Sequence, residues 1–101
     1  MTNHTIETVT FKLASGVSKE AFLKTIPAST TFIENRSGFI CRRLSCSDDG
    51  TWVEHIEWAN LKDAKLAAEA LMNNTTVLPF LQCIDGQNAT VQHSQLEVSI
   101  N

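Results

Sequence analysis

Residues 52–71, WVEHIEWANLKDAKLAAEAL, decide the fold of this chain. The first seven residues alternate with period two, so one face of a strand carries Trp52, Glu54, Ile56 and Trp58. Asn60 is a typical N-cap, and the alanine- and leucine-rich segment after it predicts an amphipathic helix over residues 61–73. A carboxylate between two tryptophans is unusual on a core-facing strand. The stretch therefore predicts a packed layer of strand and helix, and a ligand pocket within that layer.

The segments on either side complete a regular order of strands and helices. Pro27 lies inside the first predicted helix and indicates a kink or a helix in two parts, because it removes a backbone hydrogen bond. The cluster Ser47-Asp48-Asp49-Gly50 predicts a hairpin turn. In chain order we expect strand 5–13, helix 18–35, strand 39–46, strand 51–58, helix 61–73, one or two helical turns within 75–84, and strand 88–96.

This order predicts an α+β fold of the ferredoxin-like βαββαβ type, with a four-stranded antiparallel sheet and its helices on one face. We expect residues 1–101 to form a single domain. The opposite face of the sheet is predicted to carry the apolar residues Ile6, Ile40, Leu44 and Val53. That face is too apolar for a solvated surface, which predicts that a second copy of the chain covers it.

The composition argues against several classes of function. A net charge of −3 gives no electrostatic footprint for nucleic acid or for an anionic membrane. No apolar run approaches the roughly 20 residues needed to span a bilayer, and the polar start MTNHTIET does not resemble a secretion signal. Cys41, Cys46 and Cys83 show neither CxxC spacing nor an even number, so we expect reduced thiols, no metal site and a cytoplasmic location.

Arg43 and Glu54 are the first candidates for chemistry. A hairpin loop of two or four residues places Phe39 and Arg43 on the face of Glu54, and a four-residue loop puts Arg43 directly across from it. A loop of three or five residues reverses this arrangement. The two residues then form either an ordinary cross-strand ion pair or part of a cavity, in which Arg43 binds an anionic or carbonyl oxygen and Glu54 orients a base.

His93 is the candidate general acid/base. The chain has no tyrosine, His4 is expected in a flexible end, and His55 falls on the opposite face of the sheet, where it reads as an interface residue. His93 is therefore either a core or interface group, or a catalytic residue held by Glu54. The aromatic side chains are either core residues or flat walls for an aromatic ligand, and as such candidate ligand-binding residues: Phe39, Trp52, Trp58 and Phe80.

Four motifs resemble the antibiotic biosynthesis monooxygenase-like proteins of the dimeric α/β-barrel superfamily. They are GFICRRL at residues 38–44, DGTWVEHIEW at 49–58, NLKDAKLAAEAL at 60–71 and the late histidine of VQHSQLEV. The resemblance covers residues 6–98. It implies a homodimer whose two sheets close into a barrel, and a cavity between sheet and helices in each subunit.

The resemblance also bears on chemistry, because that superfamily contains cofactor-independent monooxygenases that act on polyaromatic compounds, as well as haem-degrading enzymes. Haem-degrading members use a tryptophan on the second helix and a histidine shortly after it. Ala67 stands at about that tryptophan position, and no histidine occurs between His55 and His93. We therefore expect no haem and no other cofactor.

Two functions remain open from the sequence. The resemblance implies a small-molecule-binding protein or a cofactor-independent monooxygenase-like enzyme, which acts on a small, partly aromatic compound held between sheet and helices. The alternative is a non-catalytic homodimeric domain with an interaction or structural role.

Overall fold

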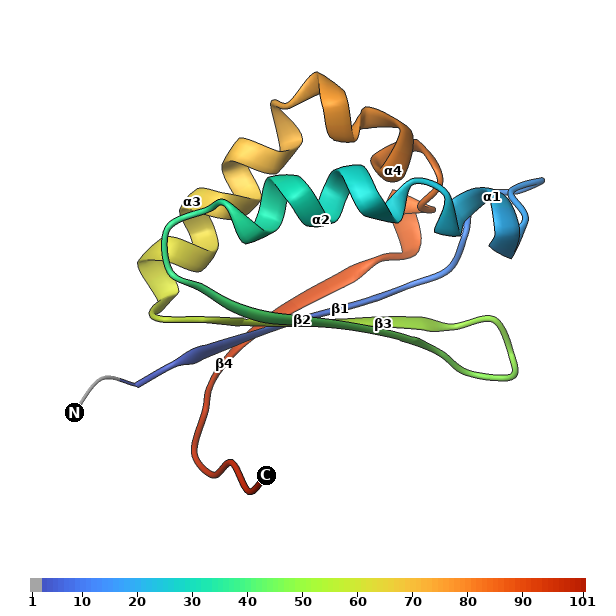
Figure 1. Ribbon diagram of the computed structural model, residues 1–101. Helices are drawn as coiled ribbons and strands as arrows, with labels where there is room; N and C mark the ends of the chain where they lie inside the picture. Colours follow the sequence, from blue (N-terminus) through green and yellow to red (C-terminus); the bar gives the residue numbers. More distant parts are fainter. Residues whose placement is uncertain (1–2) are drawn as a thin grey trace.

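One antiparallel sheet organises the chain in the computed structural model, which describes residues 3–101; Met1 and Thr2, part of the polar start, lie outside the described residues. The strands lie in the order β2-β3-β1-β4, and all neighbours are antiparallel. All helices lie on one side of the sheet (Figure 1). The strands are β1 (Thr5–Phe11), β2 (Phe39–Cys46), β3 (Trp52–Trp58) and β4 (Thr90–Gln95). The predicted ferredoxin-like fold class is confirmed.

The helical segments agree with the predicted order and with the predicted break at Pro27. The Ser18 hydroxyl accepts a hydrogen bond from the backbone N–H of Ala21 and caps the first helix. Pro27 occupies the first turn of the next helix, where its missing N–H costs no hydrogen bond. The segments are α1 (Lys19–Leu23), α2 (Ile26–Glu34), α3 (Leu61–Met72), η1 (Thr75–Val77), α4 (Leu78–Gln82) and η2 (Gly86–Asn88).

Two apolar clusters fill the layer between sheet and helices, one at each end of β3. The Trp58 cluster consists of Ile33, Ile56, Trp58, Ala64 and Ala67, with Phe39 packed against it. The Trp52 cluster consists of Phe11, Phe22, Trp52 and Phe80. The ring centroids of Phe22 and Trp52 are 4.9 Å apart, and those of Phe22 and Phe80 are 5.6 Å apart. Burial of each such ring stabilises the fold by about 2–3 kcal/mol.

The hairpin between β2 and β3 has the opposite parity from the one predicted. Cys46 pairs with Trp52, so five residues separate the paired positions. The loop closes further because Ser47 N–H donates to the Thr51 carbonyl over 2.8 Å, and Gly50 adopts φ +87°, the left-handed conformation that a three-residue turn requires. Even-numbered residues of β2 from Arg42 onward therefore face the helices.

Two predictions about strand faces fail for this reason. Leu44, expected on the open face of the sheet, lies opposite Glu54 and packs against the Trp52 cluster. Arg43, expected across from Glu54, pairs with His55 on the open face instead. A register shift between Phe39 and Cys41 restores the parity at the start of β2, so Phe39 still faces the helices, opposite Trp58.

Within residues 3–101, the structure contains no helix that is long and apolar enough to cross a membrane.

Candidate functional site

A polar band crosses the helix-facing side of the sheet between the two apolar clusters. We define it as Glu7, Ser29, Arg42, Glu54 and His93. Strand pairing explains most of it: Arg42 opposes Ile56, Ile56 opposes Glu7, and Glu7 opposes His93, so one row of the sheet runs from β2 to β4. Ionisable groups are rarely placed inside a layer of this kind unless they are paired.

The Arg42–Glu54 ion pair forms one half of the polar band. The Nε atom of Arg42 donates to Oε1 of Glu54 over 2.9 Å, and the two side chains are 7% and 6% exposed. The Nη1 atom of Arg42 donates to the hydroxyl oxygens of Ser29 and Thr30, each over 2.9 Å. The guanidinium also lies 5.4 Å from the ring centroid of Phe80, within the range of a cation–π contact.

This ion pair is incompletely satisfied. Nη2 of Arg42 and Oε2 of Glu54 are buried and have no hydrogen-bond partner among the described residues. The pKa of Glu54 is raised, chiefly because burial penalises the charged carboxylate; Arg42 opposes this shift, and the nearby charge of Glu7 adds to it. Buried groups with unmet hydrogen bonds and shifted pKa values are frequent at functional sites.

Glu7, His93 and Trp58 form the other half of the site. Oε2 of Glu7 lies 2.9 Å from Nε2 of His93, and Oε1 of Glu7 accepts a hydrogen bond from the Trp58 indole N–H over 3.3 Å. The side chain of Glu7 is 9% exposed and that of His93 is 23% exposed. Because a carboxylate only accepts hydrogen bonds, Nε2 of His93 carries the proton and a neutral ring presents Nδ1 as a free acceptor.

The structure brings some of the predicted site residues together and separates others. His93 faces the helices and Glu54 is buried on the same side of the sheet, as predicted, but each has a partner other than the predicted one. Arg42 takes the position expected for Arg43, and Glu7 rather than Glu54 holds His93. The predicted pairing of Glu54 with His93 is therefore wrong, as is the predicted pairing of Arg43 with Glu54.

A signal for Glu7 was present in the sequence. Its strand, TIETVTF, places a carboxylate on the same face as Val9 and Phe11, which is the pattern that singled out Glu54. Arg42 could not be separated from Arg43, because only the parity of the hairpin loop decides which of the two faces the helices.

The predicted aromatic residues all lie in the helix-facing layer. Trp52 and Phe80 belong to the Trp52 cluster, while Trp58 and Phe39 contact each other edge to face, with ring centroids 5.9 Å apart. The remaining histidines lie elsewhere. His55 is on the open face, as predicted, whereas His4 is not free at the chain end, because its Nδ1 lies 2.6 Å from Oε2 of Glu57.

The part of the chain that the structure describes holds no group of three or more His, Cys, Asp or Glu side chains arranged to bind a metal ion. Cys41, Cys46 and Cys83 are all free thiols.

Solved structures similar to this chain share its fold. A candidate antibiotic biosynthesis monooxygenase from Bordetella bronchiseptica superposes with a TM-score of 0.79 at 11% identity, covering 95% of this chain and 99% of its own. SnoaB, a cofactor-independent oxygenase from Streptomyces nogalater, gives a TM-score of 0.66 at 13% identity, covering 98% and 96%. A dimeric ferredoxin-like protein of unknown function from Thermobifida fusca gives 0.72 at 5% identity, covering 95% and 93%.

These matches define the class of the chain as a ferredoxin-like α+β protein with the fold of antibiotic biosynthesis monooxygenase-like proteins, in agreement with the resemblance seen in the sequence. Identities of 5–13% show the fold and not the activity. No protein-family profile and no curated protein sequence matches the chain.

Proposed function

We propose that this chain is a small-molecule-binding protein or cofactor-independent monooxygenase-like enzyme, whose ligand is a small, partly aromatic compound held between sheet and helices. The polar band carries this proposal. Two carboxylates, a guanidinium and an imidazole occupy a layer that two apolar clusters otherwise fill. Replacing buried ion pairs by apolar groups is often neutral or stabilising, so stability alone does not account for these four side chains.

In the enzymatic form of the proposal, His93 is the general acid/base. Glu7 holds the imidazole by its 2.9 Å contact with Nε2, which leaves Nδ1 to take a proton from the substrate. Arg42, in place of the predicted Arg43, would stabilise negative charge that develops on a substrate oxygen through its unpaired Nη2. Glu54 then orients Arg42 rather than His93. The substrate ring would contact the neighbouring aromatic residues Phe80 and Trp58.

The alternative, a non-catalytic homodimeric domain, is favoured by one observation. The rings of Phe11, Phe22, Trp52 and Phe80 pack directly against one another, so this part of the layer is a filled core. On that hypothesis the polar band fixes the strand register and binds no ligand.

A ligand screen separates the two hypotheses. Quinones and phenols of one to three rings, added to the folded protein, should raise the melting temperature if the layer binds them, because a ligand of the native state stabilises it by mass action. The same screen on the Arg42→Met variant is the control, since a compound bound at the polar band should lose its effect there. If no compound raises the melting temperature of the parent chain, the structural hypothesis holds.

The homodimer is part of the same proposal. No helix covers the open face of the sheet in Figure 1, and Ile40 of the edge strand β2 is 42% exposed. Beyond β4, Val98 and Ile100 are 73% and 90% exposed, which adds apolar surface for a partner. Sedimentation equilibrium at micromolar concentration should give twice the mass of 11.2 kDa, and a stable monomer would contradict the proposed homodimer.

The cytoplasmic location also stays a prediction.

A further inference from the structure

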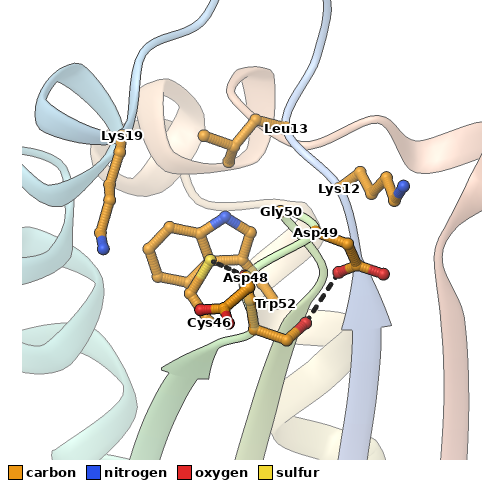
Figure 2. Close-up of a pocket in the computed structure, with 9 residues that line it drawn as sticks. Lys12, Leu13, Lys19, Cys46, Asp48, Asp49, Gly50 and Trp52 are labelled. Atoms are coloured by element: carbon orange, nitrogen blue, oxygen red, sulfur yellow. Dashed lines mark hydrogen bonds between the residues drawn. The ribbon is translucent and has the colours of Figure 1, made fainter.

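An open hollow of about 540 Å³ lies where the β2–β3 hairpin meets the end of β1 and the start of α1 (Figure 2). Its volume is in the range of small-molecule sites. None of the polar band residues lines it, so it is a different place from the site described above. Its walls include Lys12, Leu13, Lys19, Cys46, Asp48 and Trp52.

Trp52 contributes the first donor to this hollow. Its side chain is part of the core and only 4% exposed, and no hydrogen bond joins its indole N–H to another group within residues 3–101. The nitrogen is not among the buried polar atoms that lack a partner, so it is open to solvent at the hollow. In Figure 2 the indole nitrogen lies on the side of the ring toward Leu13. The other tryptophan differs, because the Trp58 indole donates to Glu7. The Trp52 indole N–H is therefore a solvent-reachable donor held in place by a packed ring, and it can donate to an acceptor atom of a ligand in the hollow.

Lys12 and Lys19 supply positive charge on two sides of the hollow (Figure 2). Neither ammonium group has a carboxylate oxygen within 4.0 Å in the described part of the chain. Nζ of Lys19 lies 5.9 Å from the centroid of the Trp52 ring, above the same side chain whose N–H is free. The Lys19 ammonium group and the Trp52 indole N–H therefore lie beside each other at the hollow, while Lys12 adds positive charge at its rim.

Two aspartates of the hairpin also line the hollow, and they act differently. The hydrogen bonds of Asp49 are made within the loop, because its Oδ1 accepts from the Thr51 N–H and from the Ser47 hydroxyl. These bonds, with a smaller contribution from Lys12, lower the pKa of Asp49 to about 2. Asp48 makes no ion pair in the described residues and is the carboxylate that opposes an incoming anion.

We propose that the hollow binds a small carboxylate that carries an aromatic or apolar body. The carboxylate accepts hydrogen bonds from the Trp52 indole N–H and from the Lys19 or Lys12 ammonium group. The apolar body packs against Leu13 and Cys46, which supply the non-polar part of the lining. This site does not depend on the function proposed for the polar band.

The test uses three probes of matched size or charge: benzoate, its neutral counterpart benzamide, and inorganic phosphate as an anion without an apolar body. The readout is the pair of indole ¹H–¹⁵N cross-peaks, because the chain has two tryptophans, one at the hollow and one bonded to Glu7. Benzoate should shift the Trp52 cross-peak to saturation while the Trp58 cross-peak stays in place. Benzamide and phosphate should bind at least about tenfold more weakly.

Charge variants test which side chains of the hollow interact with the bound carboxylate. Lys19→Gln and Lys12→Gln should each weaken benzoate binding about three- to tenfold, and Asp48→Asn should strengthen it, because it removes the opposing charge. Lys62→Gln is the matched control, since it makes the same change on an exposed lysine of α3. An unchanged Trp58 cross-peak in each variant shows that the fold is intact.

Four results would overturn the proposal, and the first three are equal binding of benzamide, equal binding of phosphate, and a Lys19→Gln variant that binds benzoate as Lys62→Gln does. A benzoate response at Trp58 alone would also overturn it, and would place the carboxylate at the polar band.

Discussion

The two faces of the sheet each carry a histidine–carboxylate pair, but the pairs differ in their surroundings. On the helix-facing side, His93 and Glu7 are 23% and 9% exposed, and Glu7 is also bonded to the buried Trp58 indole. On the open face, His4 and Glu57 are 39% and 17% exposed. Within a single chain, the same chemical groups are thus held in a layer of low dielectric on one face and closer to solvent on the other.

Adjacent arginines show the same contrast. Arg42 is enclosed and makes an ion pair and two hydrogen bonds to hydroxyl groups, whereas Arg43 is exposed and has no ion pair among the described residues. Electrostatic interactions are stronger and unmet groups more costly where water is excluded. The comparison therefore indicates that an arginine or a histidine interacts more strongly with its partners on the helix-facing side of the sheet than on the open face. We expect its contribution to function to be larger there for the same reason.

The largest expected effect concerns the two histidines. If turnover of a ligand from the screen is found, His93→Gln should lower the rate about 10²–10⁴-fold, because it removes the general acid/base. His4→Gln should leave the rate within about twofold, since His4 faces away from the helices. Steady-state kinetics measure the turnover rates of both variants. Equal rates for the two would contradict the role of His93 as general acid/base.

The arginine pair should show the next largest effect, on stability. Arg42→Met leaves the Glu54 carboxylate buried without its partner and should lower the free energy of unfolding by about 3–5 kcal/mol. Arg43→Met should change it by less than about 1 kcal/mol. Urea unfolding measures both. The double variant Arg42→Met, Glu54→Leu should recover most of the loss, and a failure to recover would mean that packing, not charge, controls the site.

The pH dependence of stability sharpens the same comparison. The pKa of Glu54 is raised mainly by burial, so the folded chain holds that proton more tightly than the unfolded chain does. Its stabilising contribution is fully present below its ordinary value of 4.5 and is lost as pH rises through the folded pKa. As pH rises from 4.5, the free energy of unfolding of the parent chain should therefore fall relative to that of Glu54→Gln. A difference between the two chains that does not change with pH would contradict the raised pKa of Glu54.

The smallest effect is expected at the hairpin that sets the two faces. Hydrogen bonds from Thr51 and Ser47 lower the pKa of the exposed Asp49 to about 2, so its contribution is present above its ordinary value of 3.8 and is lost as pH falls through about 2. Asp49→Ala should lower the melting temperature slightly at neutral pH. The difference from the parent should disappear near pH 2, and a difference that persists there would point to an uncharged role.

The order of the elements could be predicted from the sequence because each signal is local. The cap at Asn60, the proline at position 27 and the alternation in β1 and β3 each act within a few residues. The candidate site was predicted only in part, because its contacts join distant segments. Glu7 and His93 are 86 residues apart, and their pairing follows from the order β3-β1-β4 rather than from any local pattern.

The choice between Arg42 and Arg43 depended on one residue of loop length. The residue types of the turn, Ser, Asp, Asp and Gly, fit loops of either parity. What selects the three-residue turn is the set of bonds from Ser47 and Thr51 to Asp49 together with the conformation of Gly50. Such bonds are evident only once the loop is closed.

The paired irregularities of β2 have a consequence for how this protein can change over evolution. The hairpin loop and the register shift between Phe39 and Cys41 each alter parity by one residue, and together they decide which side chains of β2 point inward. A point mutation in β2 alters one side chain, but a single deletion at either irregularity would exchange the inward and outward sets of the strand. Lineages that keep the inward arginine should therefore tolerate substitutions in this segment far better than changes of its length, whereas two compensating length changes could move the arginine by one position without loss.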